Sequence, residues 1–106
     1  MKTTKARKLA RRARKNIISV LTFCTTPVLY ELHHTPAAFI DSADIDAAVA
    51  DMAAAIRRGE SVAQATEQAI EHLFKLADWR AWDYACDQGI WVSAIADPDV
   101  RWGQII

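Results

Sequence analysis

The sequence predicts an all-α fold: a compact bundle of four to five helices with a basic N-terminal helix or arm. Apolar residues recur every three or four positions through most of the chain, which is the period of a helix face. The three glycines and three prolines fall between these periodic segments. With 106 residues, of which 52% are hydrophobic, the chain is suited to a single helical domain, residues 1–106, with its own core.

The first predicted helix spans about residues 4–24, because nothing in this stretch breaks a helix. The N-terminal half of this helix is cationic nearly all round, whereas its C-terminal half is apolar enough to be core. We therefore expect residues 1–15 to be a basic projecting segment and residues 16–106 to form an acidic helical body. Spacings of four, four, three and four residues place one apolar set on a common face: Leu9, Ala13, Ile17, Val20 and Cys24.

The segment between Pro27 and Pro36 is too short for its period to decide between a helical turn and an extended connector. The next helix is predicted to begin at a cap formed by Asp41 or Ser42 and to end at Gly59. Acidic residues in its first turn and basic residues in its last turn agree with the helix dipole. Its apolar stripe consists of Ile45, Val49, Met52 and Ile56.

Ser61, followed three residues later by Gln64, is a capping-box pattern that starts a third helix. No glycine or proline interrupts residues 61–88, which as one helix would form a rod of about 42 Å. Because a domain of this size has a radius of gyration of about 13 Å, we expect a break near Asp78. The apolar face before the break comprises Val62, Ala65, Ala69, Ile70, Leu73, Leu76 and Ala77.

After the break, Asp78 is predicted to cap a fourth helix that ends at Gly89. Residues 90–96 are expected to form a short helix rather than a strand, because their surroundings are helical. A last turn is predicted to begin at Asp97 and to close at Gly103.

The charges are divided between two parts of the chain. Eight of the thirteen Lys and Arg residues lie within residues 1–15, which contain no acidic residue. Residues 16–106 hold five basic and all thirteen acidic residues, so this part has a net charge of −8. The formal net charge of zero therefore conceals two oppositely charged parts that can meet different partners or each other.

The apolar run after the basic segment is interrupted by polar residues and a proline, and it is shorter than the roughly 18 residues that a transmembrane helix needs. A membrane-surface helix needs large apolar residues opposite its cations, and among residues 1–15 only Leu9 qualifies. Two cysteines, Cys24 and Cys86, are too few for a disulfide framework. We therefore expect a cytoplasmic protein without a membrane partner.

The sequence contains no GxSxG, GxxxxGK[ST], GxGxxG or HExxH motif. The adjacent His33 and His34 point to different sides of a helix or strand, so they make no ready metal chelate. We therefore expect a protein that is not an enzyme, with no catalytic residue, no metal and no cofactor. A cleft that gathered His33, His72 and a carboxylate would revive the enzymatic hypothesis.

The basic segment is predicted to contact phosphate, because clustered cations release counterions from DNA or RNA when they bind. Cations all round a helix determine position more than sequence, so little base discrimination is expected. The alternative is a solubilising segment, or one folded onto the acidic face of the body. The predicted nucleic-acid-binding residues are Lys5, Arg7, Lys8, Arg11, Arg12, Arg14 and Lys15.

Six of the nine aromatic residues lie between positions 74 and 102. Trp79 and Trp82 are three positions apart and share a helix face, so we assign both to the core. Because Trp and Arg dominate binding hot spots, the remaining tryptophans indicate a partner surface, and packing over the helices is the alternative for them. The predicted partner-binding residues are Arg80, Trp91, Arg101 and Trp102.

Two functions stay open. The first is binding to nucleic acid or a nucleoprotein complex through the basic N-terminal helix. The second is inhibition of a host protein complex through the tryptophan surface, or through an acidic face that includes Asp78, Asp83 and Asp87. In size, helical simplicity and lack of catalytic motifs, the chain resembles small phage and mobile-element accessory proteins, including anti-CRISPR inhibitors, and this likeness is one of overall character.

Overall fold

A computed structural model describes residues 2–89 of the chain, none of which lies in a strand. The prediction of an all-α fold is confirmed for these residues. The helix predicted for residues 90–96 and the turn predicted for residues 97–103 lie outside the described residues. The elements in chain order are α1 (Lys2–Phe23), α2 (Pro27–Glu31), the 3-10 helix η1 (Pro36–Phe39), α3 (Ser42–Arg57) and α4 (Val62–Gln88).

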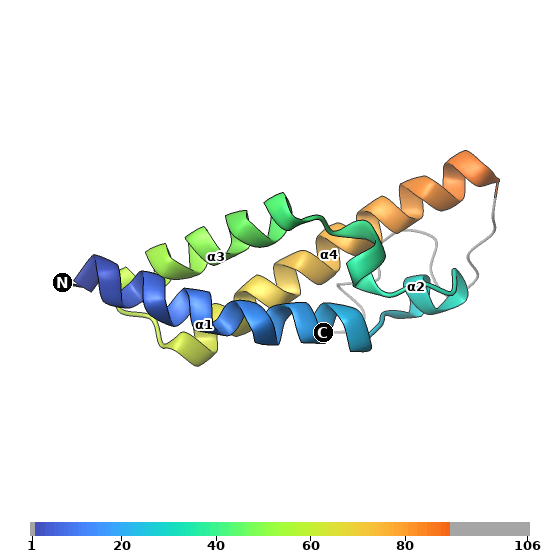
Figure 1. The fold of residues 1–106 in the computed structure, drawn as a ribbon. Coiled ribbons are helices and arrows are strands. Elements are labelled where there is room, and N and C mark those ends of the chain that lie inside the picture. Colours follow the sequence, from blue (N-terminus) through green and yellow to red (C-terminus); the bar gives the residue numbers. More distant parts are fainter. Residues whose placement is uncertain (1, 90–106) are drawn as a thin grey trace.

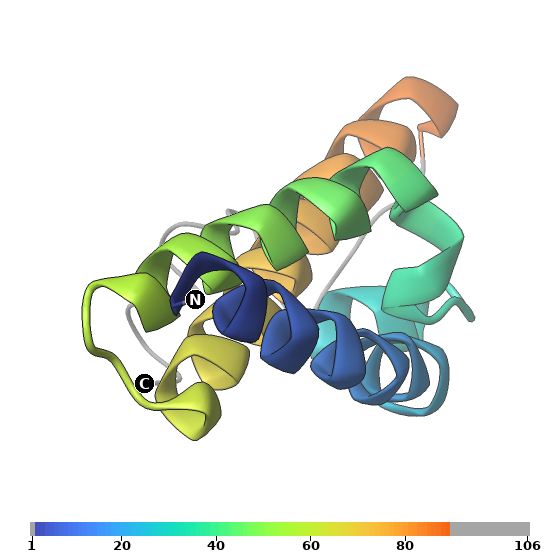
Figure 2. The same cartoon turned by 60° about the vertical axis from the view of Figure 1, so that its left-hand side comes forward.

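The three long helices α1, α3 and α4 lie side by side, and each contacts the other two (Figure 1, Figure 2). The start of α1 lies beside the end of α3, so these two helices run in opposite directions (Figure 1). At the other end of the molecule, α2 contacts α4, and η1 contacts both α1 and α4. The result is an elongated bundle with a longest extent of 51 Å and a radius of gyration of 15.0 Å.

Alanine supplies ten of the seventeen buried apolar residues of the core, so the helices meet mainly through methyl groups. The distance between two packed helices depends on the side chains at their contact, and small side chains allow the backbones to approach closely. The largest fully buried side chains include Ile17, Leu21, Leu29, Met52 and Leu73. The buried alanines are Ala6, Ala10, Ala48, Ala53, Ala55, Ala65, Ala69, Ala77, Ala81 and Ala85.

One side of α1 is buried along nearly the whole length of the helix, so the structure does not confirm a projecting N-terminal segment. Ala6 and Ala10 are 1% and 0% exposed and belong to the same core as Ile17 and Leu21. The predicted face is rotated accordingly, and Cys24 is exposed. Docking of the cationic half needs no large apolar residue, because two alanines bring the helix close enough to its neighbours.

The segment between the two prolines contains a helical turn, which decides between the two alternatives left open by the sequence. Thr26 is the N-cap of α2, and its Oγ1 accepts a hydrogen bond from the backbone N–H of Leu29 at 3.3 Å. Pro27 occupies the first helical position, where its missing N–H is not needed. Val28 and Leu29 are completely buried, so this short helix closes one end of the bundle.

The predicted ends of α3 are confirmed. Asp41 accepts a hydrogen bond from the backbone N–H of Asp44, and Asp44 accepts one from the backbone N–H of Asp41, each at 2.9 Å. This reciprocal capping box satisfies two donors that the first helical turn leaves without partners. Gly59 follows the helix with a φ of +103°, a left-handed conformation that glycine adopts without steric cost. The Ser61 cap of α4 is also confirmed, since its Oγ accepts from the backbone N–H of Gln64 at 3.1 Å.

Helix α4 is unbroken from Val62 to Gln88, so the predicted break near Asp78 is wrong. The prediction assumed a rounder core, whereas the elongated bundle gives α4 neighbours in α1, α3, α2 and η1. Asp78 caps no helix: it is completely buried, and its Oδ1 accepts a hydrogen bond from Thr26 Oγ1 at 2.5 Å. The helix does end at Gly89, as predicted.

The buried apolar residues of α4 recur at every fourth position. Because four residues turn a helix by about 400°, such a stripe advances by about 40° at each step and winds around the helix. The first part of the stripe therefore faces α3. Its last part turns towards the side of α4 on which Asp78 contacts Thr26 at the start of α2. The stripe consists of Ala65, Ala69, Leu73, Ala77, Ala81 and Ala85.

The alanine contact of α1 yields a stability prediction. Ala10→Leu adds three carbon atoms where α1 is completely buried, and overpacking of this kind costs about 1–3 kcal/mol. Urea unfolding of Ala10→Leu should show this loss, whereas the matched change Ala47→Leu on the exposed side of α3 should stay within about 0.5 kcal/mol of the unaltered chain. Equal effects of the two substitutions would contradict docking of the basic half of α1.

Candidate nucleic-acid interface

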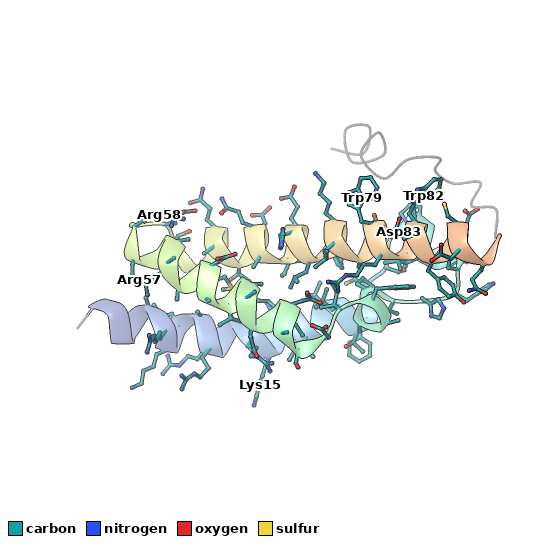
Figure 3. The ribbon with its side chains drawn as sticks, turned by 90° about the horizontal axis from the view of Figure 1, so that it is seen from above. Lys15, Arg57, Arg58, Trp79, Trp82 and Asp83 are labelled. Carbon is teal, nitrogen blue, oxygen red and sulfur yellow. The ribbon has the colours of Figure 1, made fainter. Side chains whose placement is uncertain are left out.

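The predicted basic residues of α1 occupy the half of the helix that faces solvent. At about 100° per residue, they span roughly half of the circumference, opposite the stripe of Ala6, Ala10 and Ile17. Lys15 points away from α4 in the side-chain view (Figure 3). All are exposed except Arg14, which is half-buried. We call this set the basic face; it comprises Lys5, Arg7, Lys8, Arg11, Arg12, Arg14 and Lys15.

A shallow groove of ≈ 260 Å³ lies between α1 and α3 on one side of the basic face. Its charged lining consists of Arg7, Arg11 and Arg57, with Asp46 as the single acid. Its remaining lining residues are Ala10, Val49, Ala50 and Ala53. Because three of these residues are alanines, the arginines of α1 and α3 line one common groove.

Arg57 is a member of this site that the sequence did not indicate. In the sequence, Arg57 serves only as a favourable charge at the end of α3. In the structure it lines the groove beside Arg7 and Arg11, and it also lines a second hollow beside Lys5 and Leu9. The reason is the antiparallel packing of α1 and α3, which no local pattern reveals (Figure 1).

Asp46 modifies the basic face from the opposite wall of the groove. Its Oδ1 lies 3.2 Å from Nη2 of Arg14, and the two side chains are 69% and 35% exposed. An exposed pair of this kind contributes little to stability, typically about 0–1 kcal/mol. Its main effect is therefore electrostatic, since it places one negative charge next to the arginines of the groove.

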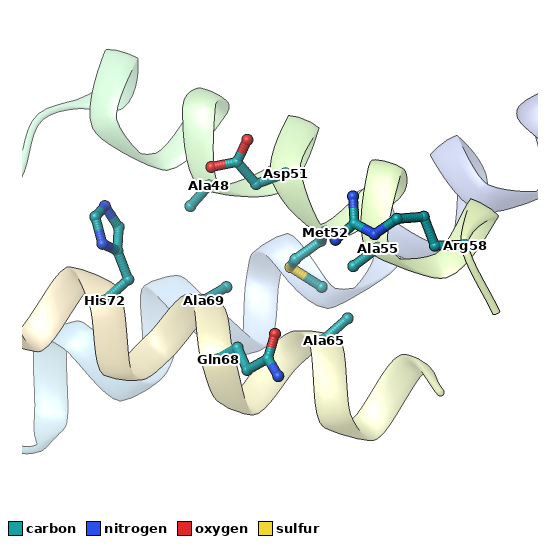
Figure 4. Close-up of a pocket in the computed structure, with 9 residues that line it drawn as sticks. All are labelled: Ala48, Asp51, Met52, Ala55, Arg58, Ala65, Gln68, Ala69 and His72. Atoms are coloured by element: carbon teal, nitrogen blue, oxygen red, sulfur yellow. The ribbon is translucent and has the colours of Figure 1, made fainter. Parts of the chain in front are cut away.

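Arg58 lies next to Arg57 in sequence but belongs to a different surface. Its Nη2 is 3.2 Å from Oε2 of Glu60, and it lines a groove of ≈ 200 Å³ between α3 and α4 (Figure 4). Asp51 and His72 come from the two facing walls of this groove. His33 is not among its lining residues, so the cleft that would revive an enzymatic hypothesis is not formed here. Within the described residues, no group of three or more His, Cys, Asp or Glu side chains could hold a metal ion.

The assignment of Trp79 and Trp82 to the core is wrong. Both side chains are half-buried, and they lie on the side of α4 that is turned away from α1 and α3 (Figure 3). Alanines take the core positions of this part of α4, namely Ala77, Ala81 and Ala85. An indole ring at those positions would hold the helices too far apart.

Arg80, predicted to bind a partner, makes its hydrogen bonds within the molecule. Its Nη1 and Nη2 donate to Oδ2 and Oδ1 of Asp44 at 2.5 and 3.0 Å, and Nη1 also donates to the carbonyl oxygen of Phe39 at 2.7 Å. These bonds join α4 to η1 and to the first turn of α3. The other predicted partner residues, Trp91, Arg101 and Trp102, lie outside the described residues.

Among the acidic residues considered for a partner surface, Asp78 is excluded because it is completely buried. Asp83 and Asp87 are exposed, as expected for a solvated helix face. The side-chain view places Asp83 on the same part of α4 as Trp79 and Trp82 (Figure 3).

Asp44 is an acid whose pKa is strongly perturbed by its hydrogen bonds. Hydrogen bonds from the Arg80 guanidinium and from the backbone N–H of Asp41 hold the pKa of Asp44 well below its usual value. The Asp44 carboxylate in turn raises the pKa of Arg80. The pair is therefore an ionised, bidentate contact at the junction of α3, η1 and α4.

Comparison of the chain with protein-family models, with curated proteins and with solved structures finds no match. In the part of the chain that the structure describes, no helix has the length and apolar character needed to cross a membrane.

The Asp44 contact yields a pH prediction. A carboxylate whose pKa is lowered by folding stabilises the protein above its unfolded pKa, about 3.9, and this stability is lost as the pH falls towards the lower folded pKa. Asp44→Asn should therefore lower the free energy of unfolding by about 1.5–3 kcal/mol at pH 7, and the difference from the unaltered chain should shrink below pH 4. Urea unfolding at pH 7 and at pH 2–3 measures this. Arg80→Gln should reduce the pH dependence in the same way; a difference that is independent of pH would contradict the assignment.

Proposed function

We propose that this protein is a non-enzymatic binding protein that contacts nucleic acid, alone or in a nucleoprotein complex, through the basic face of α1. The single observation that carries the proposal is the placement of seven cations on the solvent-facing half of one helix, joined by Arg57 from α3. A ligand that meets this surface encounters a high density of positive charge. The polyanion that best matches it is a phosphate backbone.

The cations of this surface are largely available to a ligand. Within residues 2–89, Arg14 is the only one of the seven that forms an ion pair, with Asp46. Although α1 packs against the acidic part of the chain, that part therefore leaves most of these cations without an ion pair. Unpaired Lys and Arg side chains can instead replace the counterions of a phosphate backbone, and the release of those ions drives binding.

The expected mode of contact is positioning rather than sequence reading. The cations from Lys5 to Lys15 extend about 15 Å along the axis of α1, which matches the axial span of four or five phosphates of one strand at a rise of about 3.4 Å each. Lys and Arg contacts to phosphate carry little sequence information by themselves. We therefore expect tight binding at low salt, with little preference among sequences.

Inhibition of a host protein complex is the second hypothesis from the sequence, and no observation in the described residues favours it. Arg80 is engaged within the fold, Asp78 is buried, and Trp91, Arg101 and Trp102 lie outside the described residues.

Two adjacent arginines provide a matched test. Arg57→Gln removes a cation from the groove between α1 and α3, which we call the basic groove, whereas Arg58→Gln removes the same charge from the groove between α3 and α4. In fluorescence anisotropy titrations of a labelled oligonucleotide, Arg57→Gln should weaken binding several-fold and reduce the slope of log affinity against log salt by about one, while Arg58→Gln should leave both nearly unchanged.

The same titrations decide the proposal as a whole. Salt-dependent binding by the unaltered chain, together with a selective effect of Arg57→Gln, supports the basic face as the binding surface. Absence of binding at low salt would overturn the proposed function. Equal effects of Arg57→Gln and Arg58→Gln would show that net charge, rather than the groove, determines affinity.

A substitution that strengthens binding is a sharper test than one that weakens it. Asp46→Asn removes the only acid from the lining of the basic groove and releases Arg14 from its ion pair. Affinity for the oligonucleotide should rise several-fold at low salt, because the repulsion between this carboxylate and phosphate is lost. The matched control is Asp51→Asn, because Asp51 lines the groove between α3 and α4. An unchanged affinity for Asp46→Asn would indicate that the ligand does not enter the groove.

A further inference from the structure

Phe23, the last residue of α1, has an 83% exposed side chain, the highest exposure among the large hydrophobic residues of the described chain. Single exposed hydrophobic residues are common on protein surfaces, so exposure by itself indicates no function. The position of Phe23 relative to the basic face supplies the second observation.

Phe23 lies in line with two of the cations of α1, Lys5 and Arg12. It follows Lys5 by eighteen residues, which is five full helical turns, and it follows Arg12 by eleven residues, which is close to three turns. The three side chains therefore leave the helix in nearly the same direction. Ser19 lies between Arg12 and Phe23 on this side of α1, and it is exposed as well. The line runs from cations to an aromatic ring over about 27 Å.

We propose that the basic face, if it binds nucleic acid as proposed above, takes a single strand, with phosphates along the cations and one base stacked on the ring of Phe23. Surfaces that bind single strands combine a cationic track for the backbone with aromatic side chains on which bases stack. In a duplex, both faces of each internal base are covered by neighbouring bases, so the ring of Phe23 could not stack on such a base. A length of about 27 Å corresponds to roughly eight stacked nucleotides.

The chemistry of the line also separates this ligand from a lipid surface. A membrane-bound helix places large apolar residues along the side opposite its cations. On α1 that side holds Ala6, Ala10, Ile17 and Leu21, which are buried in the core where α1 packs against α3 and α4. Phe23 stands in line with the cations instead, as required for a ligand that carries phosphates and aromatic bases on one chain.

The test uses the full chain and two matched probes. One is a labelled twelve-nucleotide oligo-dT, and the other is a labelled abasic phosphodiester of the same length, which has the same charge but no bases. The unaltered chain should bind oligo-dT about tenfold more tightly than the abasic strand, and more tightly than a twelve-base-pair duplex. Phe23→Ala should weaken binding of oligo-dT by about tenfold and leave binding of the abasic strand unchanged.

Further variants separate stacking from other roles of the side chain. Phe23→Tyr should retain the preference for oligo-dT, whereas Phe23→Leu should lose it, because leucine is apolar but offers no aromatic face. Ile18→Ala removes another exposed apolar side chain of α1 and should have no effect on either probe. Because Phe23 is so exposed, none of its substitutions should change the thermal unfolding midpoint by more than a degree or two.

The outcomes distinguish the two proposals. Salt-dependent binding of oligo-dT and the abasic strand with equal affinity, unchanged by Phe23→Ala, would overturn the stacking inference and leave the proposed function standing. Absence of binding to every nucleic acid probe would overturn both. Binding to vesicles of phosphatidylserine and phosphatidylcholine that is lost in Phe23→Ala, with oligo-dT binding unaffected, would assign Phe23 to a lipid surface and likewise overturn the inference.

Discussion

Close contact between helices through alanine methyl groups is the constraint on which the rest of this structure depends. Most of the buried core consists of alanines on α1, α3 and α4, so each helix approaches two others without large side chains between them. This contact buries one side of the basic N-terminal half of α1, although that half carries few large apolar residues. It also excludes Trp79 and Trp82 from the core, because there is no space for an indole ring between such closely packed backbones.

Methyl groups bury little area, and two polar contacts add specificity where α4 meets the short elements. Thr26 connects the cap of α2 to the buried Asp78, and Arg80 connects α4 to Asp44 and to the carbonyl of Phe39. Each contact joins a helix-capping group to a side chain of α4. Thr26 and Asp44 therefore each cap the start of one helix and also hold that helix against α4, so local and tertiary structure are coupled.

The packing of α1 also determines what the molecule presents to a partner. With one half of the helix buried, its cations are confined to the other half, where they form a dense surface instead of surrounding a free segment. Antiparallel packing against α3 adds Arg57 to this surface, and Asp46 limits its charge. The fold therefore holds these cations at fixed spacing along one helix.

The sequence by itself determined the helix ends, since the caps at Asp41 and Ser61 and the stops at Gly59 and Gly89 depend on groups only a few residues apart. It also determined that the cations cluster on one helix. Only the tertiary structure decided which side of α1 is buried, that α4 continues through Asp78, and that Arg57 lies beside Arg7 and Arg11. These features depend on which helices are neighbours. Alanine is equally compatible with core and surface, so a stripe of alanines indicates a helix without indicating which of its sides will be buried.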